Sequence, residues 1–200
     1  MGSLVLGERR TIEGTKYLSF CEVDVYAHGN TNPSKYYYAS RNPDKDVASG
    51  PDAVFVLAYN DTDVVLTKQL RPPLGKRVIA LPAGLVEPGE SYIDAALREL
   101  KEETNATEAK VTLVSPMVCL SAGLSDETGV IVFVEVADTH YIKYAGNDPM
   151  EADLSAFVVK IDQIDSFIQE ESRRSDTIFD SKCWFALQLV RASKAWSKSK

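Results

Sequence analysis

This sequence contains few of the residues that build disulfide frameworks or nitrogen- and sulfur-ligated metal sites. Its 200 residues include three cysteines, Cys21, Cys119 and Cys183, and two histidines. Because the cysteines are odd in number and widely spaced, they do not fit a disulfide framework. We expect them to be buried thiols in a reducing compartment, the cytoplasm. His28 and His140 lack the spacing of metal ligands, so neither is assigned a role.

The sequence also lacks an excess of positive charge and a long apolar run. Lys and Arg number 22 against 29 Asp and Glu, which gives a formal net charge of −7. That balance argues against a non-specific nucleic-acid binder. No apolar run approaches the length of a membrane span and no signal peptide opens the chain, so we expect no membrane partner. The 44% hydrophobic and 26% charged residues are typical of a globular protein with a sizeable core.

Alternation and turn residues predict strands with one helix in their midst and two helices at the end. The expected strands are 15–27, 35–40, 53–59, 64–70, 77–81, 110–119, 130–137 and 156–161. Helical spacing follows Ser91 and returns in 161–171 and 181–197. This order favours an α+β fold or an α/β/α sandwich. We expect residues 1–50 to form an N-terminal β-hairpin extension and residues 51–200 the main domain.

The helix in the middle of the chain has a recognisable start and an apolar side. Ser91 can cap it, with Asp94 three places on as a capping-box partner. Residues at helical spacing fall on one side, which we expect to be the packed one: Ile93, Leu97, Leu100 and Thr104.

Three glutamates gather on another side of this helix. Glu99, Glu102 and Glu103 are neighbours there, because residues three and four apart adjoin on a helix. They crowd the last turn, where the helix dipole already favours cations. Each like-charged pair costs about 0.2–0.5 kcal/mol, so a positive group is expected between them. Hard oxygen ligands indicate Mg²⁺ or Mn²⁺.

The segment that carries this helix, residues 84–106, resembles the Nudix hydrolase signature. That signature is Gly, five residues, Glu, seven residues, then Arg-Glu-aliphatic-x-Glu-Glu-x-Gly-aliphatic. The matching residues are Gly84, Glu90, Arg98, Glu99, Leu100, Glu102 and Glu103. Asn105 replaces the final Gly, and Asn tolerates the left-handed conformation that a helix-ending Gly supplies. Ala106 replaces a larger aliphatic residue, which suggests looser packing after the helix.

The flanking sequence resembles the ADP-ribose and ADP-sugar pyrophosphatase branch of that family. The two stretches that carry this likeness are LTKQLRPPLGKRVIALPAGLVEPGES and SPMVCLSAGLSDET. Two positions depart from the branch pattern, with Ala80 in place of a Glu and Ala122-Gly123 in place of Pro-Gly. The resemblance implies a Nudix-type α/β/α sandwich with a mixed sheet.

It also implies an activity, the metal-dependent hydrolysis of ADP-ribose or a related nucleoside diphosphate sugar to AMP and a sugar phosphate. Two alternatives stay open. One is another nucleoside diphosphate-linked substrate, such as NADH. The other is a Nudix-like module that senses a nucleotide without cleaving it, although such modules typically lose the glutamates that this chain keeps.

The resemblance further assigns roles to the signature residues. The carbonyl of Ala83 and the carboxylates of Glu99 and Glu103 would bind Mg²⁺ or Mn²⁺. Glu102 would add a third carboxylate or hold a metal-bound water. The remaining three residues would be structural: Gly84 for close backbone approach, Glu90 to lock the loop to the helix, and Arg98 as an orienting ion pair.

Residues outside the signature are candidates for the general base and the substrate contacts. Glu127, in the loop SAGLSDETG beside Asp126, matches the position from which some relatives supply the base, and Glu151 competes with it. Further candidates for substrate binding are Arg71, Tyr17, Tyr37 and Arg41. Arg71 suits the diphosphate or ribose because a guanidinium binds phosphate through two hydrogen bonds. The tyrosines occupy stretches from which relatives stack the adenine with aromatics of both chains, so we expect a homodimer.

Overall fold

The fold, taken from a computed structural model that describes residues 4–46, 49–144 and 152–197, divides into two units. Unit 1 comprises Met1–Asp52 and Met117–Gly129, and unit 2 comprises Ala53–Pro116 and Val130–Lys200. The division adds the segment Met117–Gly129 to the N-terminal strands, whereas the sequence placed it in the main domain. That the N-terminal extension serves dimerisation stays a prediction.

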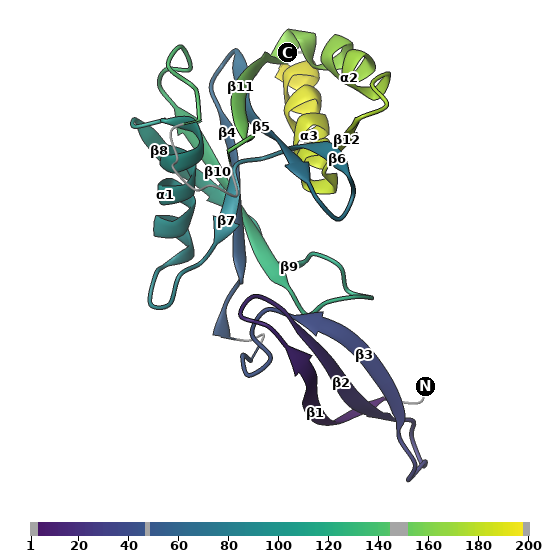
Figure 1. Cartoon of the computed structure of the whole chain (residues 1–200). Helices are drawn as coiled ribbons and strands as arrows, with labels where there is room; N and C mark the ends of the chain where they lie inside the picture. Colours follow the sequence, from purple (N-terminus) through teal and green to yellow (C-terminus); the bar gives the residue numbers. More distant parts are fainter. Residues whose placement is uncertain (1–3, 47–48, 145–151, 198–200) are drawn as a thin grey trace. The chain divides into compact units, whose positions relative to one another are not determined.

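Unit 1 contains a three-stranded antiparallel sheet in the order β1-β2-β3 (Figure 1). Its strands are β1 (Val5–Gly14), β2 (Ser19–Tyr26) and β3 (Ser34–Ser40). The sequence predicted a hairpin of the last two strands and missed β1, whose charged residues conceal any alternation. The strand expected from residue 15 begins later, because Thr15 closes a turn in which its N–H donates to the Leu18 carbonyl oxygen at 2.8 Å. Tyr17 therefore lies in a turn.

The segment Met117–Gly129 is hydrogen-bonded to the rest of unit 1. Its short strand β9 (Val118–Cys119) pairs with the first two residues of β10 (Thr128–Val136). The N–H of Ala39 in β3 donates to the Leu124 carbonyl oxygen at 2.8 Å, and the Tyr36 hydroxyl donates to the carbonyl oxygen of Gly123 at 3.0 Å. The segment thus extends the edge of the N-terminal sheet at β3.

Unit 2 is built on a mixed sheet. Besides most of β10, its strands are β4 (Ala53–Tyr59), β5 (Asp63–Arg71), β6 (Lys76–Ala80), β7 (Ala83–Leu85), β8 (Ala109–Val114), β11 (Ser155–Lys160) and β12 (Thr177–Phe179). They follow the order β12-β6-β5-β4-β10-β8, while β11 pairs with β5 and β7 with β4. β12 and β6 are parallel, and neighbours such as β5 and β6 are antiparallel.

Helices cover both faces of this sheet. They are α1 (Tyr92–Thr104), α2 (Ile164–Ser172), which follows the 3₁₀ turn η3 (Ile161–Gln163), and α3 (Ser181–Ser197). Figure 1 shows α1 on one side of the strands and α2 and α3 on the other. This arrangement confirms the predicted α+β class and the α/β/α sandwich.

Helix α1 starts and ends as its sequence predicts. The Ser91 hydroxyl accepts the N–H of Asp94 at 3.1 Å and donates to the Asp94 carboxylate at 2.7 Å. At the other end Asn105 takes the left-handed conformation, with φ 62° and ψ 16°, and its N–H donates to the Lys101 carbonyl oxygen. Asparagine adopts this conformation more readily than most residues, so it replaces the signature glycine without ending the helix elsewhere.

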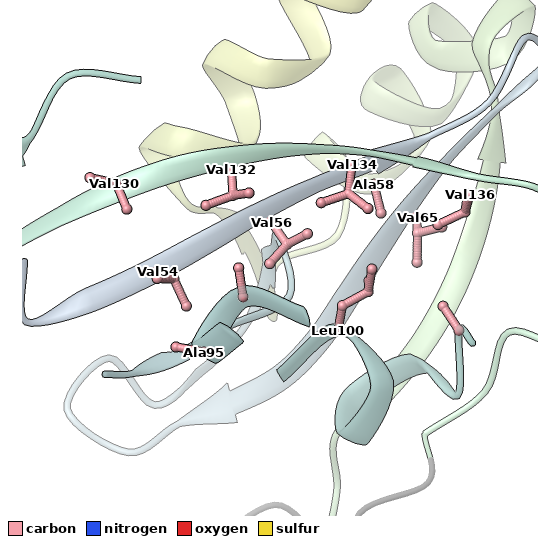
Figure 2. Close-up of a cluster of buried hydrophobic side chains, with 12 residues drawn as sticks. Val54, Val56, Ala58, Val65, Ala95, Leu100, Val130, Val132, Val134 and Val136 are labelled. Carbon is pink, nitrogen blue, oxygen red and sulfur yellow. The ribbon is translucent and has the colours of Figure 1, made fainter. Parts of the chain in front are cut away.

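The core of unit 2 lies between α1 and the sheet. Figure 2 shows Ala95 and Leu100 among the valines of β4 and β10. Leu100 and Thr104 are buried as predicted, but Ile93 is exposed because it lies in the first turn, beyond the packed stripe. Ala106 is buried in the same cluster, so the small residue after the helix still contributes to the core.

All three cysteines are free, and they differ in exposure. Cys21 and Cys183 are buried, and burial raises the pKa of the Cys183 thiol well above its ordinary value. Cys119 is exposed, so the expectation of three buried thiols is wrong at that position. The cytoplasmic location stays a prediction. None of the helices in the described ranges is both long and apolar enough to cross a membrane.

Candidate functional site

Arg98 contacts three of the signature glutamates, Glu90 in the loop before α1 and Glu99 and Glu102 on the helix. Its Nε and Nη2 atoms donate to the two carboxylate oxygens of Glu90, each at 2.9 Å. Its Nη1 donates to Glu99 at 2.7 Å and to Glu102 at 3.3 Å, and Nη2 also donates to the Leu85 carbonyl oxygen. The guanidinium is thereby the positive group that the crowded last turns of the helix require.

These contacts keep Arg98 and Glu90 charged. The Arg98 guanidinium, helped by the N–H of Glu87, lowers the pKa of Glu90 to about 2. The same carboxylates, Glu90 first, raise the pKa of Arg98 further above its ordinary range. A two-bond ion pair of this kind fixes direction as well as charge. It therefore fixes the loop between β7 and α1 to the helix. This geometry suits the roles expected of Arg98, as an orienting ion pair, and of Glu90, which locks the loop to the helix.

The carboxylates of Glu99 and Glu103 lie against β7. Glu103 is only 4% exposed, and its Oε2 accepts the N–H of Ala83 at 3.1 Å. The carboxylate of Glu99 lies so close to Gly84 that any side chain at that position would overlap it. A side chain at position 84 would therefore displace the Glu99 carboxylate, so Gly84 serves the close approach of this carboxylate rather than an unusual backbone conformation.

The donors around β7 suit a hard divalent cation. Glu99 and Glu103 place carboxylate oxygens beside Ala83 and Gly84, and oxygen-only donor sets favour Mg²⁺ or Mn²⁺. Glu102 is more open, with its side chain 55% exposed. Across the ranges that the structure describes, no three His, Cys, Asp or Glu side chains converge as a complete ligand set. These residues fit a divalent cation in their chemistry. In this structure the Glu99 carboxylate accepts a hydrogen bond from Arg98, and the Glu103 carboxylate accepts one from the backbone N–H of Ala83.

Unit 1 brings together two of the other candidates. Arg41 follows the end of β3 and Glu127 precedes β10, and the Arg41 Nε lies 2.7 Å from the Glu127 Oε1. Tyr37 stacks on Phe20 with ring centroids 5.6 Å apart and an interplanar angle of 16°. Tyr17 is exposed in the turn between β1 and β2.

Two further candidates stand apart from these groups. Arg71 is exposed at the end of β5, where its carbonyl oxygen accepts the N–H groups of Leu74 and Gly75. It therefore lies at a tight turn, in the same unit as the signature. Glu151, the competitor of Glu127, lies outside the described residues.

Some contacts were not foreseen from the sequence. The pairing of Arg41 with Glu127 joins positions 86 apart in the chain. The stacking of Phe20 on Tyr37 depends on the register of β2 against β3, in which Phe20 lies opposite Ala39. A correct register would have placed Phe20 diagonally across from Tyr37 on the same face.

The fold and the signature residues together define a class of hydrolase, and comparison with known proteins agrees. The NUDIX domain model matches residues 50–199, so the chain belongs to the Nudix family and is a Nudix hydrolase. It is 29% identical over 194 residues to the ADP-ribose pyrophosphatase of Bacillus subtilis (strain 168), covering 96% of this chain and 98% of the relative.

Two further comparisons extend this result. The chain is 48% identical over 73 residues to the ADP-sugar pyrophosphatase of Mus musculus, covering 36% of this chain and 33% of that protein. These matches confirm the branch that the flanking sequence indicated. The solved crystal structure of an ADP compounds hydrolase superposes with a TM-score of 0.66 over 98% of this chain and 95% of that chain. At 18% identity that likeness shows the fold alone.

Proposed function

We propose that the protein hydrolyses the diphosphate bond of ADP-ribose or a related nucleoside diphosphate sugar, in a reaction that depends on Mg²⁺ or Mn²⁺. The products are AMP and a sugar phosphate. The observation that carries the proposal is the full set of charged signature residues, in which Arg98 holds Glu90, Glu99 and Glu102 while Glu103 is fixed at β7. Similarity to the Bacillus subtilis ADP-ribose pyrophosphatase over nearly the whole chain supports the choice of substrate.

The signature residues divide the work of holding the cation. Glu99, Glu103 and the carbonyl oxygen of Ala83 would bind it, with Glu102 as a further ligand or as the holder of the attacking water. When bound, a divalent cation neutralises diphosphate oxygens and lowers the pKa of a coordinated water. Arg98 keeps the carboxylates of Glu99 and Glu102 oriented through the contacts described above.

The general base and the substrate contacts come from other parts of the chain. We assign Glu127 to remove the proton of the attacking water, a task that a loop carboxylate can perform when it reaches the water. Arg71 would bind the diphosphate or the ribose. Tyr37, on its exposed stacked ring, would hold the adenine together with Tyr17, and Arg41 would bind the substrate as a nearby cation.

A panel of nucleotide-linked substrates tests this function. With Mg²⁺ or Mn²⁺ present, ADP-ribose should give AMP and ribose 5-phosphate, identified by chromatography, faster than NADH or other nucleoside diphosphate sugars. Faster cleavage of NADH than of ADP-ribose would show that the proposed substrate is wrong, while the proposed hydrolysis of a diphosphate bond would stand. Binding of ADP-ribose without turnover of any substrate would identify a nucleotide sensor instead.

Replacing Tyr37 with alanine should weaken substrate binding while sparing the chemical step. Tyr37 is 49% exposed, so its free face can stack on a base. Aromatic stacking contributes about 0.5–1.5 kcal/mol beyond area burial. We therefore expect the KM for ADP-ribose to rise roughly two- to tenfold with little change in kcat, measured by steady-state kinetics.

Tyr141→Ala is the matched control, because Tyr141 is another exposed tyrosine and lies in unit 2. Its KM should stay at the wild-type value. A fall in kcat without a change in KM for Tyr37→Ala would contradict the stacking role.

We also propose a homodimer in which the N-terminal sheet contributes to the partner's nucleotide site. Strand β1 exposes the apolar residues Val5, Leu6 and Ile12, and exposed apolar strands are normally covered. Sedimentation at assay concentrations should show a dimer. A monomer with full activity at nanomolar concentration would reject the shared site.

A further inference from the structure

The ion pair of Arg41 and Glu127 unites two residues that the proposed reaction needs for different tasks. Their closest atoms, Arg41 Nε and Glu127 Oε1, are 2.7 Å apart, and both residues belong to unit 1. The Arg41 side chain is 45% exposed and that of Glu127 is 22% exposed. A carboxylate in this contact has its charge balanced by Arg41, and the guanidinium uses one of its donors for this contact.

The backbone around Glu127 is held on both sides. The Glu127 carbonyl oxygen accepts the N–H of Leu120 at 3.0 Å. The next residue, Thr128, donates its N–H and its hydroxyl to one carboxylate oxygen of Asp52 at 2.8 and 3.0 Å. The Glu127 side chain can therefore change partner by rotating about its own bonds, without release of the segment that carries it.

Other groups that can form hydrogen bonds lie beside the ion pair of Arg41 and Glu127. A polar cavity of about 10 Å³ is lined by residues that include Arg41, Glu127 and Ser40. The Ser40 hydroxyl is buried and has no hydrogen-bond partner among the residues that the structure describes. A cavity of this size holds about one water molecule. Polar groups thus surround the pair on its protein side, while the half-exposed guanidinium is open to an anion from solution.

We propose that Arg41 is a positioning residue that holds Glu127 in the substrate-free protein, and that an anionic group of the substrate displaces Glu127 from it. The exchange gives Arg41 a new negative partner and frees the carboxylate of Glu127 to act as a base. The proposal rests on the proposed function, since it takes the anion to be part of a nucleoside diphosphate sugar. It makes Glu127 available only when substrate is bound.

Competition between Glu127 and the substrate has a consequence that a purely structural ion pair lacks. In the proposed exchange the substrate breaks the Arg41–Glu127 contact as it binds, so removing the charge of Glu127 should strengthen binding. Partly exposed ion pairs are weak, which limits the expected gain in affinity for Glu127→Gln to roughly two- to fivefold. Arg41→Gln should weaken binding, because the substrate loses its partner.

Calorimetric titration of ADP-ribose into metal-free protein in EDTA measures the affinity for this substrate without turnover. The variants are Glu127→Gln, Arg41→Gln and the two combined, and the coupling between them is the quantity of interest. Asp126→Asn is the matched control, because it removes an equal charge from the adjacent residue. We expect tighter binding for Glu127→Gln, no gain for Asp126→Asn, and no effect of Glu127→Gln once Arg41 is replaced.

The outcomes separate this inference from the proposed function. If wild-type protein hydrolyses ADP-ribose but Glu127→Gln binds it no more tightly than wild type, the exchange is overturned and the function stands. An equal gain for Asp126→Asn, or a gain that persists without Arg41, would also overturn it. If wild-type protein neither binds nor hydrolyses ADP-ribose, both the function and the exchange fail.

Discussion

Removal of divalent metal with EDTA should stop the hydrolysis of ADP-ribose, and added Mg²⁺ or Mn²⁺ should restore it. The carboxylates of Glu99 and Glu103 beside β7 repel one another and the anionic diphosphate, so hydrolysis needs a cation that brings the diphosphate to these carboxylates. The measurement is AMP release in buffer with EDTA, followed by titration with each metal. Arg98 alone cannot replace the metal, because its donors are already committed to three glutamates and Leu85.

Circular dichroism of the same samples is the control for unfolding. The core of unit 2 is formed by apolar side chains of α1 and the sheet, so chelation should leave the helical signal unchanged. Activity that survives thorough chelation would contradict the metal-dependent mechanism. Loss of the helical signal in EDTA would instead assign the metal to folding.

Glu103→Gln should reduce the rate of hydrolysis by roughly 10²-fold or more, on the scale of losing one strong electrostatic contact. Glutamine keeps the size of the side chain and an oxygen that can accept the N–H of Ala83. It removes only the charge. The helix should stay folded, because loss of a negative charge in its last turn relieves repulsion at the negative end of the dipole. Initial rates at saturating Mg²⁺ measure the effect, and thermal unfolding checks the fold.

Glu170→Gln provides the matched substitution for that experiment. Glu170 lies on α2, is exposed, and contacts Arg174 at 3.5 Å. Its replacement removes the same charge from a helix far along the chain from the signature, so the rate should stay at the wild-type value. A near-normal rate for Glu103→Gln would refute its assignment as a metal ligand.

Elements with strong local signals could be predicted from the sequence. Alternation placed a strand at 53–59, where the structure has β4, and the Ser91 cap placed the start of α1 at the next residue. The signature residues of the candidate site follow from spacing, because residues three, four and eight apart are near one another on or beside a helix. The contacts of Arg98 with Glu90 and Glu102 are of this local kind.

Features that depend on distant pairing could not be predicted. Strands β7 and β12 have three residues each and exist because β4 and β6 supply their partners. β1 is charged and depends on β2 for its hydrogen bonds. The contact of Arg41 with Glu127 needs the pairing of β3 with the segment Met117–Gly129, which no short window of sequence contains.

The grouping of Met117–Gly129 with the N-terminal strands has a consequence for dividing the polypeptide. Unit 1 consists of two separate stretches of chain, so no single cut can release it as a continuous fragment. A truncation that starts at Ala53 would keep every residue of the Nudix signature. It would remove Arg41, the ion-pair partner of Glu127, and Ala39, whose N–H donates to the Leu124 carbonyl oxygen. A fragment with the boundaries of the family's sequence match would therefore keep the segment Met117–Gly129 without strand β3, to which it is hydrogen-bonded.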